Sequence, residues 1–380
     1  MNTKRAPKVR FKGFTDAWEQ RKLEALVDVC SGRDYKHLTE GDIPVYGTGG
    51  YMLSVSEALS YDKDAIGIGR KGTIDKPYIL NAPFWTVDTL FYAIPKEKVD
   101  LNFAFAIFQN INWKKKDEST GVPSLSRTAI NETHILVPQY DEQQALGQLF
   151  YGIDRLITLH QRKLDKMKEL KKTFLNLIFS QKLRFRGFTD SWELRKLGEI
   201  TEKITRKNQS LESLLPLTIS AQHGLIDQNS FFNKQIASKD VSGYYLIKNG
   251  EFAYNKSYSN AYPWGAIKRL DLHDKGVLST LYIVFKPTNV ESNFLVSYYS
   301  ADNWHKEVSI RAAEGARNHG LLNISPQDFF ETKLLIPNKY EEQEKIGVFF
   351  KKLDNLIIFN QDKINRLKNV KKILLRNMLI

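Results

Sequence analysis

The chain has 380 residues, of which 42% are hydrophobic, and its formal net charge is +13 at pH 7. This apolar content is sufficient for two or more packed cores and argues against a disordered chain. The only cysteine, Cys30, excludes a disulfide framework and a cysteine-based metal site. The excess of Lys and Arg favours a polyanionic partner, because neutralised phosphates release counterions, although many basic proteins bind no nucleic acid.

No apolar run approaches the length of about 20 residues that a membrane helix needs. The first residues, Met1 to Arg10, are basic and polar and lack the apolar stretch of a signal peptide. We therefore expect a soluble protein of the cytoplasm that has no membrane partner.

The chain opens with a segment that returns near its middle. Residues 8–23 (KVRFKGFTDAWEQRKL) recur with conservative changes as residues 182–197 (KLRFRGFTDSWELRKL). A second pair of similar segments follows Pro138 and Pro337, and its members share the residues Glu142, Gln143, Gly147, Phe150 and Asp154 with Glu342, Gln343, Gly347, Phe350 and Asp354. The chain is therefore a tandem duplication of one half-molecule.

The segments between these repeats, roughly residues 20–140 and 194–339, show almost no mutual similarity. The offset between the copies grows from 174 residues at the first pair to 200 at the second, so the second segment is longer. A repeated frame with different contents is typical of a molecule that recognises two different things through two similar mounts. The alternative is that the two segments have simply drifted apart.

The enclosed segments have the composition of short strands separated by Gly and Pro turns. We predict strands over residues 43–46, 65–68, 78–80 and 90–94 and a helix over 101–110 in the first segment, and strands over 251–254, 265–267 and 277–285 in the second. Each half is thus expected to be an α+β domain whose twisted sheet has mainly local connections.

A glycine-rich segment follows the second of these strands. Residues 67–72 (GIGRKG) have the spacing of a dinucleotide-binding fingerprint, but residues 73–77 do not continue as the helix that such a fingerprint requires. We predict instead a basic turn that presents Arg70, Lys71 and Thr73 to phosphate, and a plain hairpin is the alternative.

Three further segments combine cationic, amide and hydroxyl side chains in predicted loops. Asn suits adenine and Arg suits guanine in the major groove, so these residue types can specify bases, although ordinary surface polarity also explains each of them. These DNA-binding candidates are Ser124, Ser126, Arg127, Lys256, Ser257, Tyr258, Asn260, Arg317, Asn318 and His319.

The repeated tryptophans, Trp18 and Trp192, lie in the similar segments and not in the dissimilar ones. We therefore predict that they pack against the long helices described next, in preference to stacking on nucleic acid. A contact surface for a partner protein is a further hypothesis for the Phe-Thr-Asp-x-Trp-Glu segment that contains them.

Two long helices are predicted, from Tyr140 to Ser180 and from Tyr340 to Ile380, because neither stretch contains proline and both begin with an acidic turn. Alternating steps of four and three residues define an apolar seam on each helix. The seam comprises Ile153, Ile157, His160, Leu164, Met167, Lys171, Phe174 and Ile178, and Leu353, Ile357, Asn360, Ile364, Leu367, Lys371, Leu374 and Met378.

Two polar layers interrupt this seam at equivalent places in both helices. His160 corresponds to Asn360 and Lys171 to Lys371, and polar seam residues fix register at a cost in stability. The alternative is that Leu170 and Val370 share the seam locally while both lysines extend to solvent. Four charged residues of the first helix are assigned to a solvated face: Arg162, Lys163, Lys166 and Lys168.

The connectivity indicates how the helices pack. The first helix leads into the second repeated segment and the second helix must return, so an antiparallel coiled coil is expected. From residue 153 to 178 the seam measures about 38 Å, close to the roughly 34 Å of one turn of B-DNA. Such a pair would hold two recognition modules over two short DNA segments that an unread gap separates.

Several motifs resemble the specificity (S) subunit of type I restriction-modification systems over essentially the whole chain. These motifs are the two openings FKGFTDAWEQRKL and FRGFTDSWELRKL, the segments at 68–73 (IGRKGT), 86–91 (TVDTLF) and 121–126 (GVPSLS), and the Glu-Gln helix starts. The resemblance implies two target-recognition domains that each recognise half of a split DNA sequence.

The resemblance also implies the partners. In that family methyltransferase (M) subunits methylate adenine with S-adenosylmethionine, and restriction (R) subunits translocate and cleave double-stranded DNA with ATP and Mg. The chain itself would then be non-catalytic and would bind no cofactor. It would comprise a first recognition domain at 1–140 with a mount at 8–26, a spacer helix at 141–181, a second recognition domain at 182–340 with a mount at 182–200, and a spacer helix at 341–380.

Catalysis by this chain is not expected from its residues. It contains no G-x-x-x-x-G-K-[ST] loop for ATP and no Cys/His cluster for a metal. The main alternative function is a two-headed nucleic-acid or protein-bridging scaffold without an associated enzyme. Specific binding to split duplex sequences distinguishes the two hypotheses.

Overall fold

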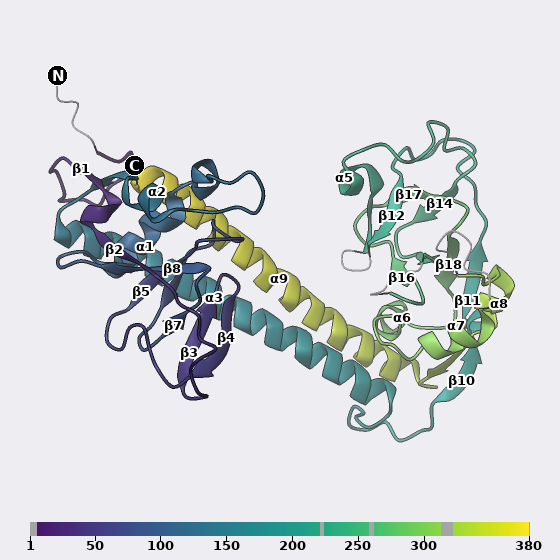
Figure 1. The fold of residues 1–380 in the computed structure, drawn as a ribbon. Helices are drawn as coiled ribbons and strands as arrows, with labels where there is room; N and C mark the ends of the chain where they lie inside the picture. The colour runs from purple at the N-terminus through teal and green to yellow at the C-terminus, as the bar shows by residue number, and fades with distance from the viewer. Residues whose placement is uncertain (1–5, 221–223, 258–261, 313–321, 380) are drawn as a thin grey trace. The chain divides into compact units, whose positions relative to one another are not determined.

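The computed structural model describes residues 6–220, 224–257, 262–312 and 322–379. The chain divides into two compact units, of which unit 1 comprises residues 1–163 and 360–380 and unit 2 comprises residues 164–359. Helices α3 (Tyr140–Phe179) and α9 (Tyr340–Met378) contribute one end to each unit (Figure 1). The two predicted long helices and the mixed helix and sheet class are therefore confirmed.

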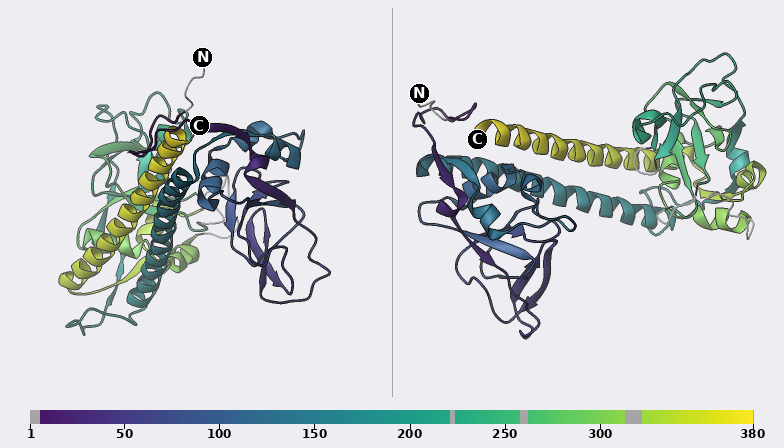
Figure 2. Two further views of the ribbon diagram at one scale, coloured as in Figure 1. Left: turned by 90° about the vertical axis from the view of Figure 1, so that its left-hand side faces the viewer. Right: turned by 45° about the horizontal axis from the view of Figure 1, so that its top comes forward.

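Unit 1 is built on an antiparallel four-stranded sheet of order β2-β8-β5-β6. A smaller sheet of order β4-β3-β7 lies on the side of the unit away from the long helices (Figure 2). The bounds are β1 (Glu19–Lys22), β2 (Val27–Ser31), β3 (Ile43–Gly47), β4 (Gly50–Val55), β5 (Ala65–Gly69), β6 (Tyr78–Leu80), β7 (Trp85–Thr86), β8 (Leu90–Pro95), β9 (His134–Val137), η1 (Leu23–Ala25), α1 (Leu101–Asn110), η2 (Trp113–Lys116) and α2 (Arg127–Asn131).

Unit 2 repeats this plan with an antiparallel four-stranded sheet of order β11-β18-β15-β16. Its strands are β10 (Glu193–Lys196), β11 (Thr201–Ile204), β12 (Leu217–Ser220), β13 (Gly224–Asp227), β14 (Tyr245–Lys248), β15 (Phe252–Asn255), β16 (Ala266–Arg269), β17 (Lys275–Leu278), β18 (Ile283–Pro287) and β19 (Lys333–Ile336). Its helices are α4 (Leu197–Ile200), α5 (Gln228–Phe232), α6 (Ser292–Tyr298), α7 (His305–Arg311) and α8 (Pro326–Phe330).

Two details of the predicted strands are wrong. The single strand expected over 277–285 is two strands, because a turn in which Tyr282 N donates to Ser279 O separates β17 from β18. The connections are also less local than expected, since β2 pairs with β8 and β11 with β18, far along the chain. These long-range pairings depend on packing that strand composition does not encode.

Near its start, each long helix accepts a hydrogen bond from the N-cap residue of a shorter helix in the same unit. The Asp100 carboxylate accepts from Phe103 N (2.8 Å) at the start of α1, and Asp100 N donates to Gln143 Oε1 (3.3 Å). In unit 2, Glu291 accepts from Phe294 N (2.6 Å), and Glu291 N donates to Gln343 Oε1 (2.9 Å). The repeated glutamine therefore positions α1 in unit 1 and α6 in unit 2.

The repeated glycine completes the same contact. A Cβ at Gly147 would collide with the Asp100 carboxylate, and a Cβ at Gly347 would lie 2.7 Å from Phe294 N. Only glycine allows the short helix to approach so closely. The shared Gln and Gly of the second repeat thus allow each long helix to pack closely against a shorter helix of its unit.

The repeated glutamates bind the mounts. Glu142, 1% exposed at its side chain, accepts two hydrogen bonds from Arg10 (2.6 and 2.7 Å) and one from Trp18 Nε1 (3.1 Å). Glu342 accepts two from Arg184 (2.9 and 2.7 Å). Trp18 and Trp192 are both buried in the core of their unit, so the prediction that they pack is confirmed.

The long helices run antiparallel within each unit. In unit 1, Asp154 pairs with Lys371 and His160 contacts Asn360 (3.3 Å), so the partner numbers fall as the α3 numbers rise. In unit 2, Lys171 pairs with Asp354 and the Phe179 ring stacks on Phe350. The predicted antiparallel arrangement is therefore confirmed in both units.

The structure also decides between the two interpretations of the polar layers. Leu170 and Val370 are 43% and 47% exposed, whereas Lys171 and Lys371 are half-buried and paired. The alternative seam is wrong, because each lysine finds an aspartate and does not extend to solvent. The other spacer positions are buried or half-buried: Ile157, Leu164, Met167, Phe174, Ile357, Ile364, Leu367 and Leu374.

A membrane-crossing helix is not found in the part of the chain that the structure describes, since no helix there is both long and apolar enough.

Candidate nucleic-acid interface

The predicted basic turn of unit 1 lies beside the Gly121–Arg127 candidate segment. Leu125 N donates to Arg70 O (2.9 Å), Gly72 N donates to Pro123 O (2.8 Å), and Lys71 forms an isolated β-bridge with Ser124. Gly72 has φ of +87°, which L side chains rarely adopt, so glycine permits the turn. Two segments about 50 residues apart in sequence therefore form one surface.

This surface encloses a cavity of about 400 Å³. Arg70, Lys71 and Arg127 are exposed around it and Glu118 supplies one carboxylate, so cations outnumber anions. The full lining comprises Ser31, Arg70, Lys71, Phe91, Glu118, Ser124, Leu125, Ser126 and Arg127. Five predicted site residues meet here, whereas Thr73 does not line the cavity.

The cationic side chains are held by few contacts. The Arg70 guanidinium lies 5.7 Å from the centroid of the Phe91 ring and donates to Asp88 O at 3.4 Å. Arg127 Nη2 donates to Ser31 Oγ (3.2 Å). Most donors of both guanidinium groups face solvent, and such groups bind phosphate or the O6 and N7 atoms of guanine in bidentate fashion.

An aspartate that the sequence analysis missed fixes the loop that carries Ser124. The Asp117 carboxylate accepts from Ser124 N (2.9 Å), Ser119 N (3.0 Å) and Ser119 Oγ (2.7 Å). These hydrogen bonds lower the pKa of Asp117 below its usual value, with the Ser124 amide contributing most. The signal in the sequence was an Asp two residues before a Ser, which is typical of an Asx turn.

The serine at the start of α2 has a structural contact as well. Ser126 Oγ accepts from Ala129 N (2.9 Å) and caps the helix. Ser126 is half-buried and lines the cavity beside Arg127, so its hydroxyl can form a further hydrogen bond to a molecule there.

One main-chain contact of this site recurs among the described residues of unit 2. Lys256 follows β15 as Arg70 follows β5, and Leu322 N donates to Lys256 O (2.9 Å) as Leu125 N does to Arg70 O. The Lys256 ammonium, however, donates to Ile324 O (3.2 Å), and burial lowers its pKa. Lys256 is half-buried and its ammonium is directed to a backbone carbonyl, and its role as a DNA-binding residue stays a prediction.

Among the other candidates of unit 2, only Ser257 is described, and it is exposed, with its amide donating to Asn255 Oδ1 (3.0 Å). The remaining candidates lie outside the described residues: Tyr258, Asn260, Arg317, Asn318 and His319.

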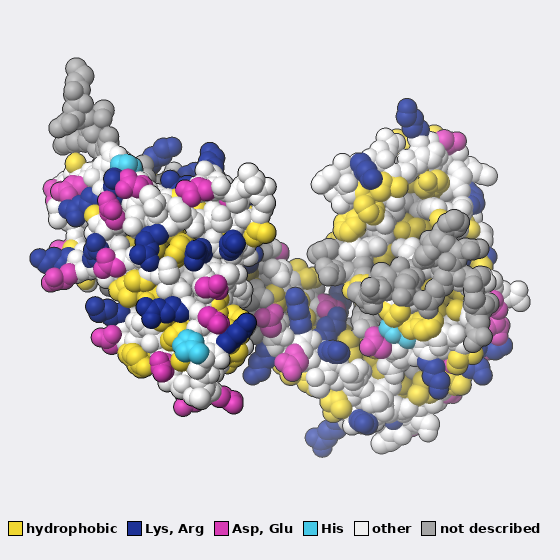
Figure 3. All heavy atoms as spheres, in the orientation of Figure 1, with side chains coloured by type: hydrophobic (Ala, Val, Ile, Leu, Met, Phe, Trp, Pro, Cys, Tyr) yellow, Lys and Arg dark blue, Asp and Glu magenta, His cyan; other side chains and the backbone are white. Residues whose placement is uncertain are grey.

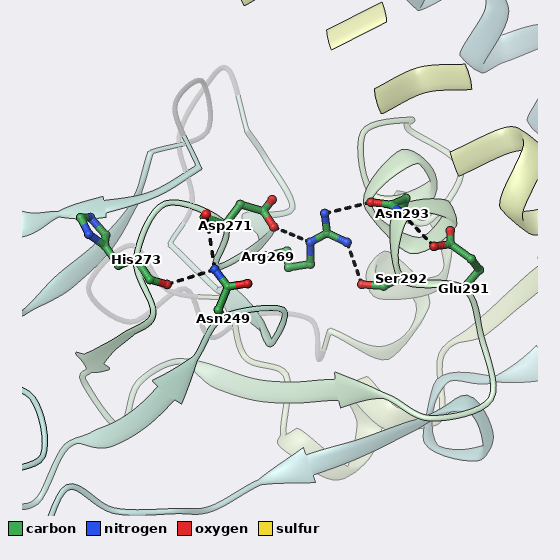
Figure 4. A network of polar contacts seen from close by, with 7 residues as sticks. All are labelled: Asn249, Arg269, Asp271, His273, Glu291, Ser292 and Asn293. Carbon is green, nitrogen blue, oxygen red and sulfur yellow. Dashed lines mark hydrogen bonds and ion pairs between the residues drawn. The ribbon is translucent and has the colours of Figure 1, made fainter. Parts of the chain in front are cut away.

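Arg269 of unit 2 is an arginine whose side chain stabilises the fold. Its guanidinium donates to Asp271 Oδ1 (2.7 Å), Ser292 Oγ (2.7 Å) and Asn293 Oδ1 (3.1 Å), as Figure 4 shows. These contacts join the end of β16 to the start of α6. Arg269 therefore differs from Arg70, whose side chain is largely open to a ligand.

On the surface, Lys and Arg side chains of unit 1 are interspersed with Asp and Glu (Figure 3). The lining of the cavity itself combines three cations with one carboxylate. Binding there depends on the particular donors of Arg70, Lys71 and Arg127.

Comparisons with known proteins point to one family. The family described as type I restriction modification DNA specificity domain matches residues 15–169, which include the whole cavity. The type I restriction enzyme MjaVIII specificity subunit of Methanocaldococcus jannaschii is 23% identical over 45% of this chain and 47% of its own length. The chain thus covers about half of that relative.

Two further similarities agree. The C-terminal part of a putative type I specificity subunit from Mycoplasma pneumoniae is 23% identical over 39% of this chain and 95% of its own length. The crystal structure of a type I restriction-modification system S subunit from M. genitalium superposes with a TM-score of 0.68 at 15% identity and covers 99% of both chains. That structure has the same fold.

Proposed function

We propose that the chain is a specificity subunit of a type I restriction-modification system, the non-catalytic subunit that selects the DNA target, and the family match over residues 15–169 and the two similar specificity subunits support this. Each unit recognises one short block of a split double-stranded sequence, and the long helices set the gap between the blocks. The observation that carries the proposal is the cavity of unit 1, where Arg70, Lys71 and Arg127 meet from separate segments.

The donors of this cavity suit a nucleic acid. Three cations can neutralise phosphates, and each neutralised phosphate adds about 0.9 to the slope of log affinity against log salt. The Arg70 and Arg127 guanidinium groups can also contact guanine, whereas Ser124 and Ser126 contribute weaker hydroxyl contacts. Phosphate contacts would fix the position of the duplex and base contacts would select the sequence.

The long helices supply a surface for protein partners. Leu156 and Leu159 are 46% and 60% exposed in unit 1, and the equivalent Leu356 and Phe359 are 52% and 64% exposed in unit 2. Equivalent apolar surfaces in both units suit two copies of one partner, which we assign to the methyltransferase subunit. That subunit would methylate adenine with S-adenosylmethionine, and restriction subunits would cleave with ATP and Mg, so the chain itself holds no cofactor.

A scaffold without an associated enzyme is the competing function, and the same exposed apolar residues are compatible with it. Selection from duplexes that carry randomised split sequences separates the two. The proposal predicts two short selected blocks at one fixed spacing, and the scaffold predicts none. A methylation map of host DNA with and without the gene should lose one split adenine motif.

Charge removal at the cavity tests the contribution of unit 1. Arg70→Ala combined with Arg127→Ala should weaken duplex binding about 10- to 100-fold and lower the salt slope by about 2, if both contact phosphate. Arg376→Ala, an exposed arginine on α9 of the same unit, is the matched control and should change neither quantity. Equal binding by the double variant and the control would refute the assignment of this cavity.

A further inference from the structure

Unit 2 carries an exposed segment that has no counterpart in unit 1. Between β13 and β15 lie the 24 residues 228–251, whereas between β4 and β5 of unit 1 lie the nine residues 56–64. Residues 228–240 of this longer connection are all exposed or half-buried, and α5 within it buries no side chain. The segment therefore adds nothing to the core and is available for contact with another molecule.

The side chains of this segment are unusual in combination. Phe231, Phe232 and Ile236 are 48%, 42% and 47% exposed. Between and around them lie four amides and two cations: Gln228, Asn229, Asn233, Gln235, Lys234 and Lys239. The surface is thus rich in groups that contact bases and phosphates.

The carboxylates at both ends of the segment are occupied by its own turns. Asp227 accepts from Asn229 N (2.9 Å) and Ser230 Oγ (2.5 Å), and Asp240 accepts from Ser242 N (2.9 Å). The serine hydrogen bonds lower the pKa of both aspartates. They stabilise the ends of the segment and leave the stretch from 228 to 239 without a carboxylate of its own.

Local contacts hold the segment in place. Gln228 N donates to Pro216 O (2.8 Å), and α5 lies against β13. His273 also acts on the Asp227 carboxylate, so the turn after β16 is close to it. That turn is fixed by Asn249 Nδ2, which donates to His273 O (3.2 Å) and Asp271 O (3.4 Å) (Figure 4). These contacts anchor the beginning of the segment.

We propose that residues 228–240 enter the major groove of duplex DNA and select bases for unit 2, an inference that rests on the proposed function. The amides of Asn229 and Gln235 suit the N6 and N7 atoms of adenine, and the phenyl groups suit thymine methyl groups. Lys234 and Lys239 contact the flanking phosphates. The extra residues of unit 2 therefore supply the base contacts that its occupied Lys256 does not.

The composition favours DNA over a protein partner. Lysine is depleted at protein interfaces, where apolar side chains gather into a continuous patch. Here Asn233, Lys234 and Gln235 lie between Phe232 and Ile236 in the chain, so the apolar residues of the segment are not consecutive. Figure 3 shows the same mixture of hydrophobic and Lys or Arg side chains in the part of unit 2 where Figure 1 places α5.

The test selects targets for the full chain from duplexes in which both blocks are randomised. Two variants are compared with the parent: Phe231→Ala with Phe232→Ala, and Asn229→Ala with Gln235→Ala. Each should lower affinity for the parental target about tenfold or more and relax the sequence of one block, while the other block stays unchanged. Leu281→Ala, which truncates another exposed apolar residue of unit 2 (59% exposed), is the matched control and should leave both blocks unchanged.

The outcomes separate this inference from the proposed function. If the parent selects two blocks and both variants select the same two blocks, the inference is overturned and the proposed function stands. A parent that selects no block refutes the proposed function itself. Variants that keep both blocks but lose binding to the methyltransferase subunit also overturn the inference. Because no buried side chain is changed, the unfolding midpoint should stay within about 2 °C of the parent.

Discussion

The two units bury the same lysine and aspartate at the helix seam but surround them differently. In unit 1, Lys371 pairs with Asp154, donates to Gln109 Oε1 (2.6 Å) and lies 5.9 Å from the centroid of the Phe105 ring. In unit 2, Lys171 pairs with Asp354, and a second cation, Lys268, acts on both members of the pair. The same repeated pair thus has an additional hydrogen bond in unit 1 and a second cation nearby in unit 2.

The difference arises from Lys268, which belongs to a dissimilar segment but acts on the repeated Lys171–Asp354 pair. Lys268 lies on β16 opposite Ala253, where unit 1 has Tyr78 on β6 opposite Gly67. Burial lowers the pKa of Lys268, the charge of Lys171 lowers it further, and Asp354 opposes both. Strand β16 therefore brings a second cation close to the ion pair of the spacer helices in unit 2.

The largest expected effect comes from removing the glutamate that binds each mount. Glu142→Ala leaves the Arg10 guanidinium and the Trp18 indole without their acceptor and should lower the free energy of unfolding by about 4 kcal/mol. Glu342→Ala should cost about 1 kcal/mol less, because no tryptophan bond is lost there. Urea denaturation measures both losses, and hydrogen exchange assigns each to its unit.

Exposed ion pairs at equivalent positions provide the controls. Glu132→Ala removes the partner of Lys22 in unit 1, and Glu331→Ala removes the partner of Lys196 in unit 2. Neither should move the unfolding midpoint measurably, since both pairs are exposed. Equal losses for Glu142→Ala and its control would contradict the role assigned to Glu142.

A smaller effect is expected at the seam lysines. Lys371→Met removes an ion pair and the Gln109 hydrogen bond and should destabilise unit 1 by about 2 kcal/mol. Lys171→Met should cost less than about 1 kcal/mol, because Lys268 is near enough to neutralise Asp354 in its place. The difference between the variants in urea denaturation is the test, and a larger loss for Lys171→Met would reverse the comparison.

The smallest effect should be a gain. Lys268→Ile replaces this second cation with an apolar side chain and should raise the free energy of unfolding by about 1 kcal/mol at pH 7. The lowered pKa of Lys268 means that the folded state favours the neutral amine, so the penalty is complete at low pH and fades as pH approaches the usual value of 10.5.

The pH dependence therefore separates this mechanism from better packing. The advantage of Lys268→Ile over the parent should shrink between the lowered pKa of Lys268 and pH 10.5, as measured by urea denaturation at several pH values. An advantage that is constant over this range would attribute the gain to packing alone.

The elements with regular sequence patterns were predictable, because their signals are local. The long helices, the first-segment strands and the helix at 101–110 follow from periodicity and composition, and duplication revealed Glu142 and Asp154 as important before their contacts were known. Pairing across long sequence distances was not predictable. The approach of Arg70 to Arg127 depends on which strands become neighbours, and the burial of Lys256 depends on Ile324, some 70 residues away.

The main-chain hydrogen bond between the two segments of the cavity bears on which mutations this site can accept. The bond from Leu125 N to Arg70 O, and its counterpart from Leu322 N to Lys256 O, joins main-chain atoms only, so it tolerates almost any substituent on the residues that it connects. Mutations in these loops can alter specificity without dismantling the anchor beneath them.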